Sequence, residues 1–450
     1  MGRARSHREG RRVTELRFYW SRLNANYWFY PALFSIVAVT GAIGLIWLDR
    51  NGFSAWLNRV PEIVPARPAS ATNMLTVIAG SMIGVASTVF SITIAAVAYA
   101  SGTYGPRLLT NFMEDKGNQL SLATFIGTFV YAITVLRTVR ADDEAAATLE
   151  EATATTLPGF VPQLSLLVAY LLMALSVAVL VYFLNHIPSS IRINTVLKGI
   201  GRRLVEQVRQ EFPNEDCGRE PEASPPGSPV LARHIGYIQM IDFDDLSAFA
   251  KTRDCTIALK VRTGDFVHPG MTLAELSDCD PLDDEFIADF HDDFLLGASR
   301  TPKQDPDFLI DELVEIALRA LSPGINDPFT AITALHWLGA ATAELGTRDL
   351  RKDAFDDDGE RRVLPLPDGF AHYVERGFGR ARGGVATNPV AALVAFDTIW
   401  NASLPIASDT RKALLRAEGQ RLMAQARLSL DGPDLADVEK RFAEFEANFG

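Results

Sequence analysis

Cysteine is scarce in this 450-residue sequence, which contains only Cys217, Cys255 and Cys279. Three scattered thiols are too few for a disulfide framework, and their spacing does not match a zinc site. They suit a reducing compartment, where thiols stay unpaired. We therefore expect no bound metal and no cofactor.

Catalytic signatures are also missing. The sequence contains no G-x-S-x-G elbow, no Walker loop, no H-E-x-x-H helix and no paired cysteines. The stretch GFGRARGG (377–384) begins like a dinucleotide-binding loop, but Arg382 stands where the third glycine belongs, so we predict a mobile arginine-bearing loop. Nothing makes a positive case for catalysis, and the prediction is that the chain is not an enzyme.

An excess of basic residues is missing as well. Asp and Glu (55) outnumber Lys and Arg (43), and the formal net charge is −12. Because phosphate binding requires clustered Lys and Arg, we expect no nucleic-acid partner.

Charged residues are absent from four apolar runs near the start of the chain: Tyr30–Leu48, Met74–Ala100, Leu120–Leu136 and Leu164–Leu184. A membrane-spanning helix needs about 20 apolar residues, so these runs predict an α-helical membrane protein with four transmembrane helices in contact with the lipid bilayer. The third run is the weakest, because it is short and contains three threonines. The lack of buried carboxylates argues against a proton-coupled transporter or pump.

The charges around these runs are unevenly distributed. One basic group precedes the first run: Arg3, Arg5, Arg8, Arg11, Arg12, Arg17 and Arg22. Another follows the fourth run: Arg192, Lys198, Arg202, Arg203 and Arg209. Between the third and fourth runs the chain is acidic, with Asp142, Asp143, Glu144, Glu150 and Glu151. By the positive-inside rule, both termini are cytoplasmic in a multi-pass protein, and the first run, which no cleavage site follows, is a retained anchor.

Small residues form a stripe along the second span, at spacings of three and four: Ser81, Gly84, Thr88, Ser91 and Ala95. Two interpretations are open. Small residues let helices pack closely in lipid. Alternatively, hydroxyl groups from symmetry-related helices line a pore and replace part of the hydration shell of an ion.

The composition divides the chain into a series of segments: a basic cytoplasmic N-terminus (1–29), a transmembrane domain (30–186), a juxtamembrane helix (187–212), a flexible linker (213–229), a small β-rich unit (230–280) and a mainly helical cytoplasmic domain (281–450). The last two form a cytoplasmic α+β domain. The juxtamembrane helix carries one apolar stripe, which we expect to pack against neighbouring subunits or to lie on the bilayer. Further helices are predicted at about 388–402, 409–428 and 433–447.

The β-rich unit is predicted from two strand-like runs, Gly236–Ile241 and Thr256–Val261, with Asp242 as the cap of a short helix between them. The stretch VRTGDFVHPGMTLAEL (261–276) resembles the half-repeat of lipoyl- and biotinyl-type β-sandwich domains. The lysine that those domains modify is absent here. We therefore expect a compact β-barrel-like adaptor without that chemistry.

The stretch ALRALSPGINDPFTAI (317–332) joins two predicted helices. In the first helix an apolar face is expected to be buried, with Asp311 and Glu312 mainly on the other faces. Ser322-Pro323-Gly324-Ile325 fits a type II turn, with positive φ at the glycine. Asp327 is expected to cap the next helix, whose first residue is Pro328. The loop is then a plain helix corner. The alternative is that Asn326 and Asp327 bind a cation or activate a water molecule.

The stretch RTPKQDPDFLIDELVEIALRALSPGINDPFTAITAL (300–335) closely resembles a family of bacterial predicted membrane proteins whose domain has no known function. The segments 236–246 and 90–109 carry the same resemblance. The family-motif loop contains Arg319, Ser322, Pro323, Gly324, Asn326, Asp327 and Pro328 in this sequence. The resemblance implies an integral protein of the inner membrane with a cytoplasmic C-terminal domain, and it implies no reaction or ligand.

Three functions remain as hypotheses. The first is a homo-oligomeric channel or transport-related protein whose second span lines the pathway and whose cytoplasmic domain regulates it. The second is a non-conducting scaffold or sensor that binds a cytosolic protein or a small ligand. The third is a membrane-anchored enzyme that uses Asn326, Asp327 or His336.

Overall fold

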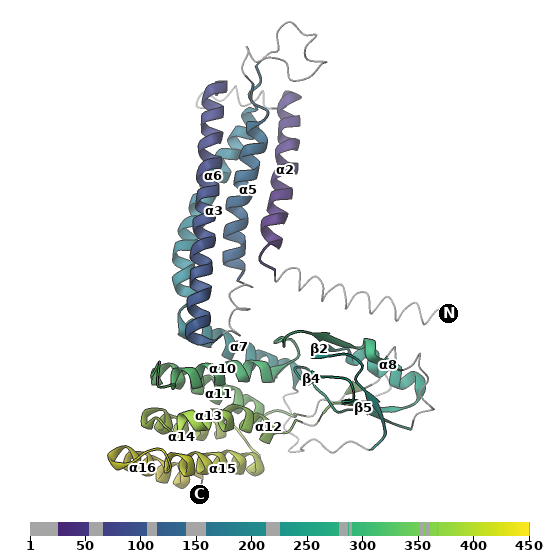
Figure 1. The fold of residues 1–450 in the computed structure, drawn as a ribbon, viewed down its shortest axis with the longest axis vertical. Coiled ribbons are helices and arrows are strands. Elements are labelled where there is room, and N and C mark those ends of the chain that lie inside the picture. The colour runs from purple at the N-terminus through teal and green to yellow at the C-terminus, as the bar shows by residue number, and fades with distance from the viewer. Residues whose placement is uncertain are drawn as a thin grey trace. The chain divides into compact units, whose positions relative to one another are not determined.

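The computed structural model describes residues 26–53, 66–105, 115–140, 159–212, 226–278, 287, 290–350, 354–355, 361–366 and 368–449. Most of the basic N-terminus, the acidic segment around Asp142 and most of the linker after position 212 lie outside these residues. The chain divides into a membrane unit, residues 12–192, and a C-terminal unit that contains residues 193–450. Each is described by itself (Figure 1).

The membrane unit consists of helices α2 (Phe29–Arg50), α3 (Pro68–Tyr104), α5 (Lys116–Leu136) and α6 (Gln163–Ser190). All four are long and apolar enough to cross a membrane. Each predicted span lies within one of them, so four membrane helices followed by a region of mixed sheets and helices are confirmed.

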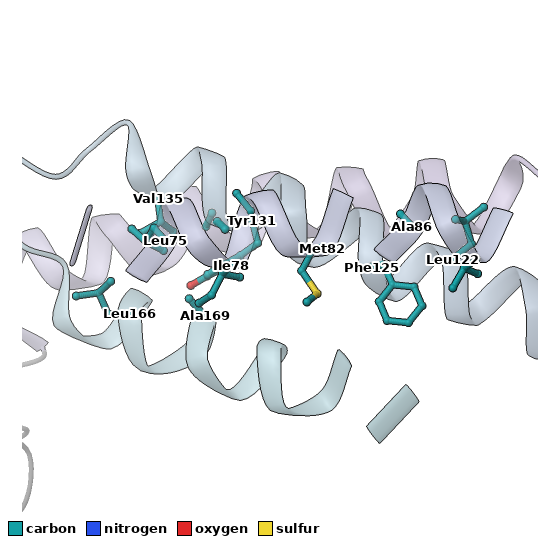
Figure 2. Packing of buried hydrophobic residues seen from close by; sticks show 14 of the residues in the cluster. Leu75, Ile78, Met82, Ala86, Leu122, Phe125, Tyr131, Val135, Leu166 and Ala169 are labelled. Carbon is teal, nitrogen blue, oxygen red and sulfur yellow. The ribbon is translucent and has the colours of Figure 1, made fainter. Parts of the chain in front are cut away.

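Helix α5 is the most enclosed of the four and packs against α2, α3 and α6. Two of its buried hydroxyl groups are paired with α6. The hydroxyl groups of Thr128 and Ser176 are 3.1 Å apart, and the Tyr131 hydroxyl donates to the Ser165 carbonyl at 3.1 Å. The threonines that weakened the prediction of this span are tolerated because each has a partner: Thr128 lies against α6, and Thr124 and Thr134 donate to the Leu120 and Val130 carbonyls of their own helix. Figure 2 shows Phe125, Tyr131 and Val135 in this packing.

Two carboxylates fix helix ends in the membrane unit. Asp49, at the end of α2, accepts hydrogen bonds from the backbone N–H groups of Leu164 and Ser165, both at 3.0 Å, in the first turn of α6. Asp115 caps α5 and lies 2.8 Å from Nε2 of His186, near the end of α6. A negative charge at a helix N-terminus satisfies free N–H groups and interacts favourably with the helix dipole.

The C-terminal unit begins with α7 (Ile193–Glu211), which packs against α10 (Pro306–Ala320) and α11 (Pro328–Gly346). The predicted apolar stripe is buried: Leu197, Ile200, Leu204 and Val208. The expectation that another subunit or the bilayer covers this stripe was wrong, because helices of the same chain cover it. The contact is close at Gly201, where a Cβ atom would lie 2.3 Å from the Trp337 ring.

The β-rich region contains two sheets. The first has the order β1-β5-β3-β8-β7 and the second β4-β2-β6. Their strands are β1 (Ser228–Leu231), β2 (Gly236–Ile241), β3 (Thr256–Leu259), β4 (Phe266–Val267), β5 (Thr272–Ser277), β6 (Phe294–Gly297), β7 (Ala354–Phe355) and β8 (Arg361–Leu364). All pairs are antiparallel except β3 with β8. Three strands therefore come from beyond position 280, so the segment 230–280 is shorter than the region that forms the sheets.

Local signals in this region are confirmed. The side chain of Asp242 accepts from the Asp245 N–H and caps α8 (Phe243–Arg253). Gly264 and Gly270 both have φ of +95°, so the two glycine turns around Val267 are present. A residue with a Cβ atom rarely adopts this conformation.

The remaining helices are α12 (Phe370–Val374), the π-helix η4 (Glu375–Gly379), α13 (Arg380–Val385), α14 (Pro389–Ser403), α15 (Asp409–Ala426) and α16 (Gly432–Phe449). The last three match the predicted positions. The predicted loop at 377–384 was wrong, because that segment is helical and largely buried. Glycines there make room for neighbours: a Cβ atom on Gly384 would lie 2.7 Å from Leu318.

The contact between α7 and α11 gives a first prediction. Gly201→Ala should destabilise the protein by about 1–3 kcal/mol, because the new methyl group overlaps the Trp337 ring. Gly199→Ala is the matched control on the same helix, since a Cβ atom there meets nothing within 4 Å and alanine favours a helix. Thermal unfolding of the full chain in detergent, followed by tryptophan fluorescence, gives the unfolding midpoint of each variant. Equal unfolding midpoints for the two variants would contradict this packing.

Candidate functional site

The small-residue stripe of the second span lies on the outer face of α3. Ser81, Gly84, Thr88, Ser91 and Ala95 are all exposed within the described chain. At about 100° per residue they fall on one side of the helix. Leu75, Ile78, Met82 and Ala86 lie on the opposite, buried side (Figure 2).

The stripe therefore does not mediate packing among the four described helices of one chain. A Cβ atom on Gly84 would meet nothing within 4 Å. The hydroxyl groups donate to the backbone of their own helix, from Thr88 to the Gly84 carbonyl at 3.1 Å and from Ser91 to the Ser87 carbonyl at 2.9 Å. This face is smooth, and its hydroxyl oxygens still have acceptor capacity.

The family-motif loop joins α10 to α11, but the predicted type II turn was wrong. The Ser322 carbonyl accepts hydrogen bonds from the N–H groups of Ile325, at 3.0 Å, and Asn326, at 2.9 Å. Positive φ occurs at Asn326 (49°), whereas Gly324 is not among the residues with positive φ. The chain makes one more helix-like turn, and asparagine tolerates the left-handed conformation that ends it.

The predicted cap of α11 is present. The Asp327 carboxylate accepts from the Thr330 N–H at 3.2 Å and from the Thr330 hydroxyl at 2.6 Å. Pro328 is the first helical residue, and the side chain of Arg319 lies 3.5 Å from Glu315. His336 is exposed and not a core residue. Both oxygens of Asp327 thus hold a helix end, and the loop has the geometry of a corner.

A buried cluster of charges in the C-terminal unit is the feature that the sequence reasoning missed. Asp311, 7% exposed, contacts three arginines. Arg300 Nη1 lies at 2.6 Å, Arg376 donates through Nε at 2.9 Å and Nη2 at 2.7 Å, and Arg380 Nη1 lies at 3.0 Å. These arginines come from the loop after β6, from η4 and from α13, so one carboxylate on α10 joins four segments.

Two more carboxylates of the α10 start belong to this cluster. Arg300 binds Asp305 through Nε at 3.0 Å and through Nη2 at 2.7 Å. Asp307 lies 2.9 Å from His372 Nε2 and 2.8 Å from Arg376 Nη1. Gly264 is required nearby, because a Cβ atom there would lie 2.2 Å from the Asp305 carboxylate. The glycine turn of the β-rich region therefore fits against this ion pair.

The environment of each carboxylate sets its protonation. Burial raises the pKa of Asp305 to about 6, against the opposing effect of Arg300. Burial also opposes ionisation of Asp307, but the hydrogen bond from His372 and the charge of Arg376 outweigh it and lower the pKa. For Asp311, Arg376 and Arg300 likewise outweigh burial and lower the pKa. Asp307 and Asp311 are thus ionised at neutral pH.

One sequence signal pointed to this cluster. Asp307 and Asp311 are four residues apart on one helix, where like charges repel unless cations face them. Arg376 and Arg380 repeat the same spacing. Asp311 and Glu312 were expected mainly on faces other than the buried apolar one, but both are buried. The partners could not be matched from spacing alone, since 65 residues separate Asp311 from Arg376.

A cavity of about 220 Å³ borders the cluster within the C-terminal unit. Apolar residues form one part of its wall: Ile241, Phe243, Leu259, Val261 and Leu366. Charged residues form another: Glu211, Arg262, Asp305, Asp307 and Asp368. Tyr373 also lines it, and burial raises the pKa of this phenol well above its ordinary value, so it is a neutral hydrogen-bonding group.

Within the residues that the structure describes, no three His, Cys, Asp or Glu side chains come together as a metal site. The arrangement instead offers paired carboxylates beside an apolar recess. Such a recess suits the binding of a small molecule more than acid–base chemistry, because Asp305, Asp307 and Asp368 are already held by an arginine or a histidine.

The profile of a family described as "Predicted membrane protein (DUF2254)" matches residues 24–399. Uncharacterised proteins of Mycobacterium tuberculosis and Mycobacterium bovis are 33% identical to this chain over 325 residues. The match covers 70% of this chain and 60% of each relative, so it spans well under two thirds of their length. No solved structure matches this chain.

The buried cluster gives a prediction about stability. Asp311→Asn should lower the free energy of unfolding by about 3–5 kcal/mol, because three arginines would then face a neutral amide. Glu439→Gln is the control: Glu439 binds Arg427 at 2.9 Å, but its side chain is 45% exposed, and such a pair contributes about 1 kcal/mol or less. Chemical denaturation of the full chain in detergent measures the free energy of unfolding of both variants. If both variants lost the same amount of this free energy, the cluster would not be the stabilising contact described here.

Asp305 gives a prediction about pH. Its pKa rises from 3.8 in the unfolded chain to about 6 in the folded protein, so between these values only the folded state keeps the proton. The contribution of Asp305 is therefore fully present below about pH 4 and is lost as the pH rises to about 6, by about 3 kcal/mol in total. Asp305→Asn should abolish this slope. The free energy of unfolding measured at several pH values tests it, and an unchanged slope in the variant would refute the assignment.

Proposed function

The chain belongs to the DUF2254 family of predicted membrane proteins, and from that premise we propose that it is a homo-oligomeric channel or transport-related protein of the bacterial inner membrane. In this proposal α3 lines the pathway and the C-terminal unit is a cytoplasmic regulatory domain. Because the chain spans only part of its relatives' length, the proposal concerns this chain.

The exposed stripe on α3 carries the proposal. Four helices of one chain leave Ser81, Gly84, Thr88, Ser91 and Ala95 uncovered, on the side opposite the buried face of α3. Small residues at a lipid-facing position offer little contact area to lipid, but they allow a second backbone to approach closely. Copies of α3 arranged around an axis would place this smooth face along a pathway, with hydroxyl oxygens available to a hydrated ion.

The charge distribution supports the orientation. The basic segments before α2 and after α6 are placed in the cytoplasm by the positive-inside rule, and so are both termini. The absence of charged residues within the four predicted spans supports a passive pathway and not a proton-coupled pump.

A non-conducting sensor is the second candidate, and the 220 Å³ cavity of the C-terminal unit favours it. Catalysis is not part of either proposal. Asp327, a candidate of the membrane-anchored enzyme hypothesis, uses both carboxylate oxygens to hold Thr330 at the start of α11, and we propose that the chain is not an enzyme.

The conduction proposal is tested by Thr88→Phe in liposomes that contain the purified full chain. The bulky ring should abolish ion flux, because it projects from the exposed stripe into the proposed pathway. Val181→Phe on α6 is the matched control: this side chain is also exposed, at 65%, but it does not belong to the stripe. Flux is read with an ion-sensitive dye, and chemical cross-linking reports whether both variants assemble as the parent does.

The two outcomes against the proposal are distinct. Flux that is unchanged in Thr88→Phe would exclude α3 as the lining helix. A parent protein that assembles but passes no ion would favour the sensor.

A further inference from the structure

The cavity in the C-terminal unit has two chemically different parts. Residues of β2, β3 and the neighbouring loops supply the apolar part, which includes Ile241, Leu259 and Leu366. The end of α7, the start of α10 and the segment before α12 supply the acidic part, which includes Glu211, Asp307 and Asp368. A molecule that fits both parts needs an apolar body and a polar end.

The volume of the cavity limits the size of a ligand that can bind there. An apolar cavity of about 150 Å³ holds one benzene molecule, and drug-sized ligands occupy about 300–1,000 Å³. A cavity of about 220 Å³ lies between these cases. It accommodates one ring with a short side arm.

The charges that line the cavity determine which polar group the ligand can carry. Four carboxylates border the cavity, those of Glu211, Asp305, Asp307 and Asp368, against one arginine, Arg262. Arg300 and Arg376, which hold Asp305 and Asp307, do not line the cavity. An anion entering the cavity would face like charges, whereas a cation with N–H groups would meet acceptors.

The carboxylates can accept hydrogen bonds from a cationic ligand. An ionised carboxylate accepts about four hydrogen bonds. Glu211 and Asp368 share this capacity with neighbours that include Gln207, which donates to Glu211 at 2.7 Å, and Arg262, which binds Asp368. The Tyr373 hydroxyl adds a neutral group on the same wall.

We propose that this cavity binds a small organic cation, an ammonium or amidinium group on a single apolar ring, with its charged end at Glu211, Asp307 and Asp368. Glu211 is the last residue of α7, the helix that follows α6 after two residues. A ligand here therefore contacts the C-terminal end of the helix that connects the two units along the chain. The inference does not depend on conduction, because binding is measured directly.

The test uses the full chain in detergent and three probes that share a phenylethyl group and differ in its polar end: 2-phenylethylamine, 2-phenylethanol and 3-phenylpropionate. Isothermal titration calorimetry measures the affinity of the protein for each probe, with detergent micelles alone as the blank. The ammonium probe should bind at least tenfold more tightly than the alcohol, and the carboxylate should give no saturable binding. Equal or tighter binding of the carboxylate, or no saturable binding of the ammonium probe, would overturn the proposal.

Two variants locate the binding. Glu211→Gln removes one charge without changing the size of the side chain, and it should weaken ammonium binding several-fold while leaving alcohol binding unchanged. Leu366→Trp fills the cavity from a half-buried loop position and should abolish binding of both probes. Leu428→Trp, at an 82% exposed position, is the control for the added indole. Parent-like ammonium affinity in folded Leu366→Trp protein would place the binding elsewhere and overturn the assignment.

Discussion

The carboxylate of Asp311 is buried among three arginines, and much of the C-terminal unit is arranged around it. A buried charge is tolerated only when it is paired and hydrogen-bonded. Arg300, Arg376 and Arg380 meet this requirement, but they come from distant parts of the chain. The β-rich region and the helical region are therefore held at α10 by an interaction that fails if either side moves. Gly264 belongs to the same arrangement, because only a residue without a Cβ atom leaves room for Asp305 there.

The membrane unit follows a different rule. Its polar groups gather around α5, where Thr128 and Tyr131 have partners on α6. In lipid, apolar side chains gain little by leaving the bilayer for a protein interior, so close fit and internal hydrogen bonds specify the packing. The outer face of α3 departs from this pattern, since its small and hydroxyl-bearing residues lie outside the bundle of one chain. That departure is the observation on which the proposed oligomer with α3 at its centre rests.

The two proposals meet at α7. This helix starts two residues after α6 and is held in the C-terminal unit by α10 and α11. Its last residue, Glu211, lines the cavity beside the charge cluster. A ligand in the cavity would thus interact with a helix that is joined directly to the last membrane span. Regulation of a pathway by the C-terminal unit needs a connection of this kind, because a ligand shifts an equilibrium only through contacts that differ between two states.

The sequence by itself determined the local features: four apolar spans, the caps at Asp242 and Asp327, and the two glycine turns around Val267. Each depends on neighbouring residues, so composition and spacing are sufficient. Tertiary structure alone decided which face of α3 is exposed, what covers α7 and which strands join the sheets. It also brought Asp311 to Arg376, across 65 residues. A charged side chain has the same local pattern whether water or a distant arginine neutralises it, and for that reason the cluster and its cavity became visible only in the fold.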